Sequence, residues 1–225
     1  MQSTVTNRPT TAHAQAMRLA MIDSQLRPNA VSDPRVIAAM ADVAREAFVP
    51  DTVAAVAYAD VKLPLARGRM MNLPVATGRL LTAAALRDAD AVLLIGAAGG
   101  YTAAVLARLV ASVVAVEADA ELAGMARQAL VDVPNVTLVE GPFAAGHSAA
   151  APYDAIIIDG AVEHVPQALV DQLALEGRLT TGLIDNGVCR LSVGRRTAGG
   201  FGLTDFADFD AAHLPGFALE RGFVF

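Results

Sequence analysis

The stretch Val92-Leu-Leu-Ile-Gly-Ala-Ala-Gly-Gly-Tyr101 decides the fold of this chain. A short run of large aliphatic residues leads into a glycine-rich turn, and the next residues, 101–110, have the pattern of a helix. A buried parallel strand followed by such a turn and helix is typical of a doubly wound sheet, in which ligands bind at the carboxyl ends of the strands. Glycine lets the backbone approach a ligand closely, and a helix N-terminus favours negative charge.

Outward from this stretch, short β-branched runs alternate with amphipathic segments, which predicts crossover helices between parallel strands. We expect strands at 92–95, 113–117, 136–139 and 155–159, and helices at 101–110, 120–131 and 165–173. Three further strands, 178–183, 188–193 and 203–209, follow one another without helices and should pair antiparallel at one edge. The fold class is therefore α/β: a doubly wound Rossmann-like sheet, mostly parallel, with an antiparallel C-terminal edge.

The region before residue 89 predicts a helical extension of this core. Residues 1–13 are polar and predict a disordered lead, 14–26 and 34–48 have helical spacing, 51–74 is irregular, and 74–87 is again helical. We expect one integrated domain, with the extension at 14–88 and the core at 89–225. The apolar segment 213–225 is expected to pack down onto the core.

Composition excludes several classes of protein. Hydrophobic residues make up 54% of the 225 residues, and the formal net charge is −6. That charge argues against nucleic-acid partners, which need clustered Lys and Arg. A single cysteine excludes an intrachain disulfide, and neither a secretory signal nor a membrane span is recognisable, so we expect a cytoplasmic protein. His147 and His164 each stand alone without metal-ligand spacing, so no metal is expected.

The candidate site combines the glycine turn with Glu117, which ends the second core strand. A carboxylate at that position can accept hydrogen bonds from both ribose hydroxyls of a nucleoside. This arrangement is shared by dinucleotide enzymes and methyltransferases. The loop reads Gly-x-x-Gly-Gly rather than Gly-x-Gly-x-x-Gly, and the C-terminal run of strands favours the methyltransferase sheet by fold-level analogy.

From about Met17 to Pro215 the sequence resembles the protein-L-isoaspartate O-methyltransferase family. Arg45-Glu-Ala-Phe-Val-Pro50 is the most specific match, and Val92–Tyr101 and Val113-Val-Ala-Val-Glu117 resemble the motifs that bind the cofactor. Pro152-Tyr-Asp-Ala-Ile-Ile157 resembles a later strand motif. The resemblance implies transfer of a methyl group from S-adenosylmethionine to the α-carboxyl of L-isoaspartyl residues, a protein-repair reaction in which the ester then cyclises to a succinimide.

The resemblance also implies a set of site residues and partners. The cofactor is expected to contact Gly96, Ala97, Ala98, Gly99, Gly100, Tyr101, Glu117, Pro142, Phe143 and Asp159. Segment 60–74 is expected on the acceptor side, with Asn72 and Asp60 as catalytic candidates. The expected partner is a peptide or protein carrying isoaspartate, and the expected state is a monomer or a weak homodimer.

Three departures from the family pattern leave alternatives open. Leu94 replaces an acid of the first motif, Pro142 replaces an aspartate that meets the adenine, and Asn72 replaces the serine of the substrate loop. Losing polar anchors weakens binding, since a hydrogen bond to a charged group contributes about 1.5–3 kcal/mol. The alternatives are a methyltransferase with another acceptor, a non-enzymatic binding protein on the same fold and, less favoured, an NAD-linked oxidoreductase.

Overall fold

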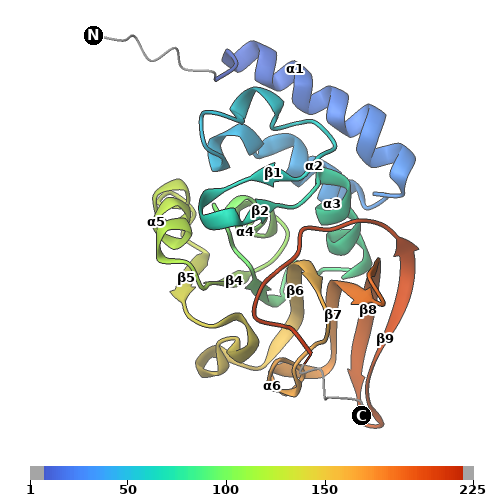
Figure 1. Ribbon diagram of the computed structural model, residues 1–225. Coiled ribbons are helices and arrows are strands. Elements are labelled where there is room, and N and C mark those ends of the chain that lie inside the picture. The colour runs from blue at the N-terminus through green and yellow to red at the C-terminus, as the bar shows by residue number, and fades with distance from the viewer. Residues whose placement is uncertain (1–7, 220–225) are drawn as a thin grey trace, which may run out of the picture.

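A central seven-stranded sheet organises the protein, whose computed structural model describes residues 8–219. Its strand order is β5-β4-β3-β6-β7-β8-β9 (Figure 1). The strands are β3 (Ala91–Ile95), β4 (Ser112–Glu117), β5 (Val136–Glu140), β6 (Tyr153–Val162), β7 (Leu173–Asp185), β8 (Val188–Thr197) and β9 (Gly200–Asp208). Pairing is parallel from β5 to β7 and antiparallel from β7 to β9, so the predicted α/β class and antiparallel C-terminal edge are confirmed.

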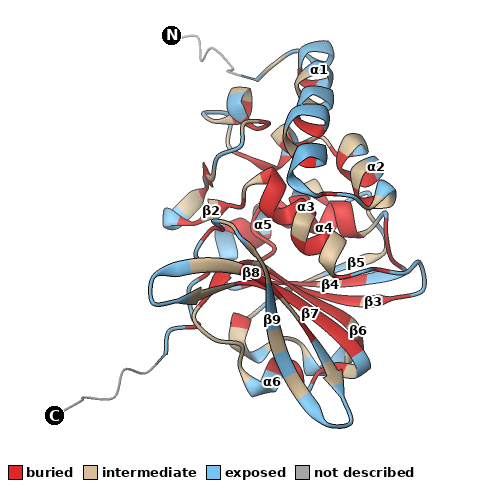
Figure 2. Cartoon of the chain, turned by 90° about the vertical axis from the view of Figure 1, so that its right-hand side faces the viewer, coloured by how far each residue is buried: buried red, intermediate tan, exposed pale blue. Residues whose placement is uncertain are grey.

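Helices lie on both faces of the sheet, with α2 to α5 on one side and α6 on the other (Figure 2). The core helices are α4 (Tyr101–Leu106), α5 (Ala120–Ala129) and α6 (Gln167–Val170). Successive side chains of β3 enter opposite cores, because a strand alternates its faces. Leu94 packs in the cluster beneath α2 to α5, whereas Leu93 and Ile95 join the cluster that contains Leu169 and Phe217.

The N-terminal extension forms a helical layer above the sheet. It comprises α1 (Thr11–Met21), the π-helical turn η1 (Ile22–Leu26), the 3₁₀ turn η2 (Arg27–Asn29), α2 (Pro34–Asp42), the 3₁₀ turns η3 (Arg45–Phe48) and η4 (Ala54–Val56), the hairpin of β1 (Leu63–Pro64) and β2 (Met70–Met71) around the 3₁₀ turn η5 (Ala66–Gly68), and α3 (Pro74–Ala83). The disordered lead predicted for 1–13 is wrong at its end, because Thr10 caps a helix that starts at Thr11. Residues 1–7 lie outside the described part.

Several predicted helices are shorter in the structure. The helix predicted to reach residue 48 ends at Asp42, because Val43 takes an extended conformation with a ψ angle of 120°. The helix predicted to reach residue 87 ends at Ala83, and Ala85 follows with a φ angle of 47°. The third crossover helix, α6, covers only Gln167–Val170. Two 3₁₀ turns, η6 (Phe143–Ala145) and η7 (Ser148–Ala150), lie between β5 and β6.

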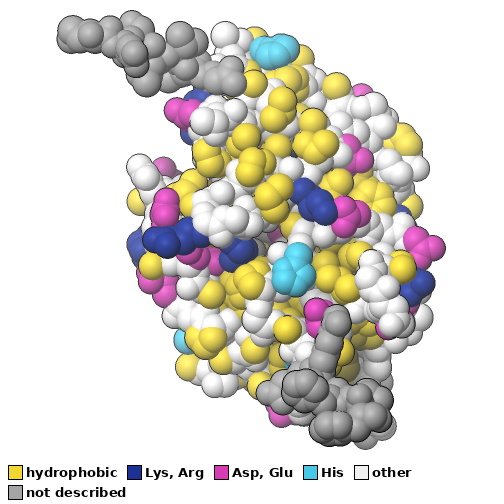
Figure 3. Space-filling model, in the orientation of Figure 1, with side chains coloured by type: hydrophobic (Ala, Val, Ile, Leu, Met, Phe, Trp, Pro, Cys, Tyr) yellow, Lys and Arg dark blue, Asp and Glu magenta, His cyan; other side chains and the backbone are white. Residues whose placement is uncertain are grey.

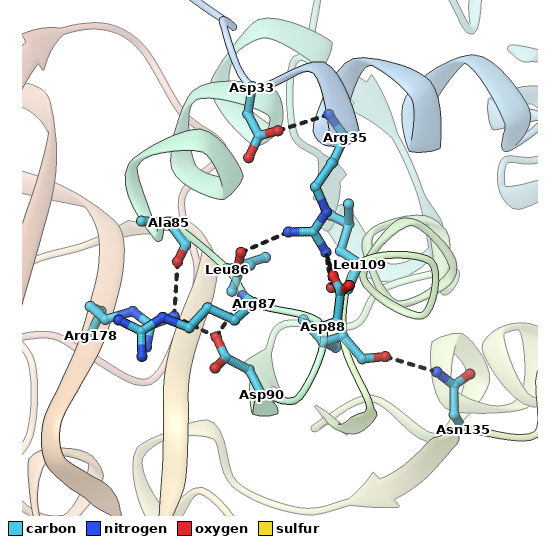
Figure 4. Close-up of polar contacts among 11 residues, drawn as sticks. Asp33, Arg35, Ala85, Leu86, Arg87, Asp88, Asp90, Leu109, Asn135 and Arg178 are labelled. Atoms are coloured by element: carbon cyan, nitrogen blue, oxygen red, sulfur yellow. Dashed lines mark hydrogen bonds and ion pairs between the residues drawn. The ribbon is translucent and has the colours of Figure 1, made fainter.

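A buried ion pair and the hydrogen bonds around it fix the chain where α3 leads into β3 (Figure 4). Arg178 of β7 donates to the carbonyls of Ala84 and Ala85 and pairs with Asp90. The side chains of Arg178 and Asp90 are only 8% and 5% exposed. This cluster lies at the amino end of β3, and it anchors the end of α3 far from the glycine turn.

The chain returns over the sheet after β9. Backbone bonds join the amide of Ala161 to the carbonyl of Ala212 at 2.7 Å and the amide of Leu214 to the carbonyl of Ala161 at 2.9 Å. The segment crosses from β9 back toward β6 (Figure 1). Leu214 and Phe217 are buried, which confirms for the described residues the prediction that the apolar tail packs down. Among residues 8–219, no helix is long and apolar enough to cross a membrane.

Candidate active site

The glycine turn after β3 forms as the sequence predicts, and two of its glycines are required for different reasons. Gly96 has a φ angle of 85°, a conformation that favours glycine, and a Cβ placed there would lie 3.0 Å from Leu214. A Cβ on Gly99 would lie 2.4 Å from the carbonyl oxygen of Phe48. Gly99 thus allows η3 to pack against the turn, whereas Gly96 forms the floor of a site that Leu214 covers.

Glu117 lies at the end of β4 and is completely buried. One carboxylate oxygen accepts from the amides of Ala118 and Asp119 at 2.9 and 3.1 Å, and the other accepts from the amide of Ala98 at 2.7 Å. Arg69 adds two contacts, from Nη1 at 2.7 Å and from Nη2 at 3.4 Å. A carboxylate offers about four lone-pair sites, so this one has no free acceptor capacity.

Arg69 and Phe143 form the next layer of the site. The guanidinium carbon of Arg69 lies 5.0 Å from the centroid of the Phe143 ring, a cation–π distance. Phe217 stacks nearly parallel to Phe143, with ring centroids 6.4 Å apart and an interplanar angle of 6°. The Phe143 ring, which the family resemblance assigns to the adenine, is therefore in contact with two side chains of the protein itself.

Asp159 of β6 collects three side-chain donors at the same edge of the sheet. Asn72 Nδ2 and the Thr77 hydroxyl each donate to Oδ1 at 3.1 Å, and the Thr102 hydroxyl donates to Oδ2. Asn72 is 2% exposed, and its own Oδ1 accepts from the amides of Leu73 and Ala212. The network joins the start of α3, the start of α4 and the returning C-terminal segment to one carboxylate.

Arg45 holds the backbone of Asn72, a member of this network. It is fully buried, donates through Nε to the carbonyl of Ala57 at 2.8 Å and through Nη2 to the carbonyl of Asn72. Its guanidinium carbon lies 4.7 Å from the ring centroid of Tyr101. Burial raises the pKa of the Tyr101 hydroxyl although the Arg45 cation opposes that shift, so Tyr101 stays a neutral donor. The Tyr101 hydroxyl has no hydrogen-bond partner among the described residues.

Space at the site is very small. The cavity between β2, the glycine turn and Asp159 has a volume of about 10 Å³, room for one water molecule. A pocket for a ligand of nucleoside size needs about 300 Å³ or more. The groups that converge there suit an adenosyl ligand: a carboxylate, an aromatic ring and a glycine that lets the backbone come close. The space for that group is taken by Arg69 and Leu214.

The structure brings together many of the residues that the sequence nominated. Six of them line the cavity: Asn72, Gly96, Ala97, Ala98, Tyr101 and Asp159. Glu117 and Phe143 adjoin it through Arg69. Asp60 and Pro142 are exposed and do not line it, and Gly99 and Gly100 pack against Phe48 and Leu130. The roles of all these residues stay predictions.

Four residues at the site were not predicted from the sequence: Arg69, Arg45, Thr102 and Leu214. Arg45 belongs to the most specific family motif, so that motif is a signal for its burial. Arg69 stands in a segment read as irregular, where no local pattern indicates its partner. Asp119 accepts from two amides at the start of α5, so its carboxylate serves as a helix cap.

Acidic and basic side chains are intermixed on the outer face near α5 (Figure 3). Arg67 lies 3.6 Å from both Asp119 and Glu121, and Arg127 pairs with Glu140 at 2.5 Å. A separate groove of about 320 Å³ runs between η3 and α5, but neither Glu117 nor Asn72 lines it. The convergent polar groups therefore select the small cavity as the candidate active site.

Comparisons with known proteins give consistent results. The family model described as Protein-L-isoaspartate(D-aspartate) O-methyltransferase matches residues 17–209. A protein-L-isoaspartate O-methyltransferase of Methylorubrum populi is 44% identical over 73% of this chain and 78% of its own length. One from Koribacter versatilis is 39% identical over 81% of this chain and 83% of its own.

Solved structures agree at the level of the fold. One of a protein-L-isoaspartate O-methyltransferase has a TM-score of 0.75 at 20% identity and covers 91% of this chain and 67% of its own. A structure of a putative protein-L-isoaspartate O-methyltransferase from Plasmodium falciparum, in complex with S-adenosyl-L-homocysteine, has a TM-score of 0.74 at 16% identity. It covers 88% of this chain and 98% of its own. At these identities the likeness concerns the arrangement of helices and strands.

Proposed function

Because the chain belongs to the protein-L-isoaspartate O-methyltransferase family, we propose that it methylates the α-carboxyl of L-isoaspartyl residues in damaged proteins. The family match and the curated relatives confirm the sequence predictions of an S-adenosylmethionine-dependent O-methyltransferase and of its cofactor. The single observation that carries the proposal is the convergence of Glu117, the Gly96 turn and the Asn72–Asp159 pair at one sheet edge.

Glu117, Gly96 and Phe143 are proposed to hold the adenosyl part of the cofactor. Glu117 accepts from the ribose in place of the hydrogen bonds that it accepts from Arg69, Gly96 lets the backbone approach the ribose, and Phe143 stacks on the adenine. Tyr101 contributes a neutral hydroxyl that is buried, unpaired within the described chain and on the cavity wall. The cofactor supplies a methyl carbon activated by a sulfonium sulfur, which an acceptor carboxylate oxygen attacks.

Asn72 is proposed to position the acceptor carboxylate. Its amide nitrogen has two hydrogens, of which one is used by Asp159. The second is free to donate to a carboxylate oxygen, and Asp159 fixes its direction. The acceptor carboxylate is already the nucleophile, so the protein needs to orient it rather than to deprotonate it. Arg45 holds the backbone of Asn72 in place and thereby sets this geometry.

The departures from the family pattern are partly offset in this arrangement. Leu94 is fully buried in the core, so the acid expected at that position has no counterpart there. Asp159 is close to the turn through Thr102 and provides a carboxylate on the neighbouring strand, β6. The exposed Pro142 offers no amide hydrogen, which leaves recognition of the adenine to the Phe143 ring.

Methyl-ester formation on synthetic peptides tests the proposal. Two peptides differing only in L-isoaspartate or L-aspartate are incubated with the full chain and radiolabelled S-adenosylmethionine, and base-labile label is counted. We expect label on the isoaspartyl peptide alone. Label on neither peptide, at cofactor concentrations that saturate binding, would refute the assignment, and label on other carboxylates only would favour a different acceptor.

Variants of Asn72 separate positioning from folding. Asn72→Ser restores the residue of the family motif, and we expect it to keep activity, because a hydroxyl also donates to a carboxylate. Asn72→Ala removes the donor and should lower the rate of transfer by about tenfold, as expected for about 1.4 kcal/mol. Equal rates for Asn72→Ala and the parent protein would remove Asn72 from the acceptor site.

We further propose that the protein acts in the cytoplasm as a monomer or weak homodimer. The unpaired Cys189 fits the reducing environment of the cytoplasm. Light scattering after size exclusion tests the state, and we expect the mass of one chain at micromolar concentration. A stable mass of two chains after dilution would contradict it.

A further inference from the structure

Arg69 occupies the place that the proposed function gives to the adenosyl group. Its guanidinium nitrogens donate to both oxygens of Glu117, at 2.7 and 3.4 Å, where two ribose hydroxyls are expected. Its guanidinium lies over Phe143, where an adenine ring is expected. One side chain thus reproduces both contacts of a nucleoside, the donors to the carboxylate and the flat group on the aromatic ring.

The two occupants exclude each other. Glu117 has no acceptor capacity left while Arg69 is paired with it, because three backbone amides donate to the same two oxygens. The cavity beside Arg69 has a volume of only about 10 Å³. Leu214 closes the site above Gly96, because its side chain would lie 3.0 Å from a Cβ placed on that glycine. An adenosyl ligand therefore needs Arg69 to leave before it can reach Glu117.

We propose that Arg69 is a latch on the cofactor site that sets the affinity for S-adenosyl ligands, an inference that rests on the proposed function. In the free protein Arg69 pairs with Glu117, and ligand binding exchanges this pair for the ribose. An open state populated at about 1–10% is a common value for a minor conformer. The apparent dissociation constant is then about 10- to 100-fold higher than that of a site that is always open.

Calorimetric titration with S-adenosylhomocysteine tests the latch. Arg69→Gln removes the charge and the paired donors, and we expect it to bind about tenfold or more tightly than the parent protein. Arg67→Gln is the matched control, because Arg67 is 71% exposed in the same segment and does not touch Glu117. We expect the control to bind like the parent. Equal or weaker binding by Arg69→Gln would overturn the latch.

Chemical modification of arginine gives a second readout on the unaltered protein, which does not depend on a variant that folds. The arginines that phenylglyoxal modifies are mapped by mass spectrometry with and without S-adenosylhomocysteine, and the exposed Arg67 serves as the internal reference. We expect Arg69 to be protected in the protein without ligand and to react more when the ligand is bound. Unchanged or lower reactivity at a saturating ligand concentration would also overturn the latch.

The two failures are distinguishable. If the parent protein binds S-adenosylhomocysteine, but Arg69→Gln binds no more tightly and Arg69 stays protected, only the latch is wrong. If neither the parent protein nor Arg69→Gln binds at millimolar concentration, the proposed cofactor site itself is wrong. Tight binding by Arg69→Gln together with weak binding by the parent supports both.

Discussion

Replacing Arg178 by methionine should destabilise the protein strongly, because this arginine neutralises a buried carboxylate. Asp90 is 5% exposed at its side chain, and without Arg178 it keeps one side-chain hydrogen bond among the described residues, from the amide of Arg87 at 3.0 Å. The carbonyls of Ala84 and Ala85 lose their donor from Arg178 as well. Removing one partner of a buried ion pair costs about 3–5 kcal/mol.

The effect on melting temperature follows from the size of the chain. For a protein of 150–250 residues a loss of 1 kcal/mol lowers Tm by about 2–4 °C, so Arg178→Met should lower it by about 6–20 °C. The double variant Arg178→Met with Asp90→Asn leaves no unpaired charge in the interior. We expect its loss of stability to be smaller than the sum of the two single losses, with a coupling of about 0.5–3 kcal/mol.

Thermal and urea unfolding followed by circular dichroism measure these differences. Arg195→Met is the matched control, because Arg195 lies on the neighbouring strand and pairs with Glu176 at 3.3 Å while both side chains are 57% exposed. An exposed pair contributes about 0–1 kcal/mol, so the control should unfold nearly like the parent protein. An Arg178→Met variant no less stable than Arg195→Met would refute the reasoning about the buried cluster.

Three further outcomes are expected. Asp159→Asn should slow methyl transfer by about tenfold, because Asn72 loses its fixed direction, and a rate within twofold of the parent would contradict this. Leu214→Ala should bind S-adenosylhomocysteine more tightly in calorimetry while losing about 2–5 kcal/mol of stability, whereas the exposed Leu219→Ala should change neither. Burial raises the pKa of Tyr153 to about 12 from 10.0. The unfolded chain loses this proton first, so stability should fall as pH rises from about 10 to 12, less steeply in Tyr153→Phe, and equal slopes would exclude this cause.

The parts of the fold that local sequence patterns determine were predictable. The aliphatic run before Gly96 and the glycines after it indicated β3, its turn and α4, because strand, turn and helix are there adjacent in sequence. Glu117 at the end of β4 followed from the same reasoning. The strands of the C-terminal edge were also recognisable, since no helical segment separates them.

The arrangement around the cavity was not predictable from one sequence, because it depends on contacts between distant segments. Arg69 and Glu117 are 48 residues apart, and nothing in a segment read as irregular indicates which carboxylate an arginine meets. The apolar tail was expected to pack down, but its composition does not reveal that Leu214 covers Gly96. Asp60 was expected on the acceptor side from the family resemblance, but it is exposed and does not line the cavity.

A crystal structure of the protein with S-adenosylhomocysteine tests the central claim most directly. We predict that the ribose hydroxyls lie on Glu117, that the adenine lies on Phe143, and that Arg69 is displaced from both. A ligand bound elsewhere, or a crystal at saturating ligand in which Arg69 still pairs with Glu117 and no ligand lies above Gly96, would contradict it.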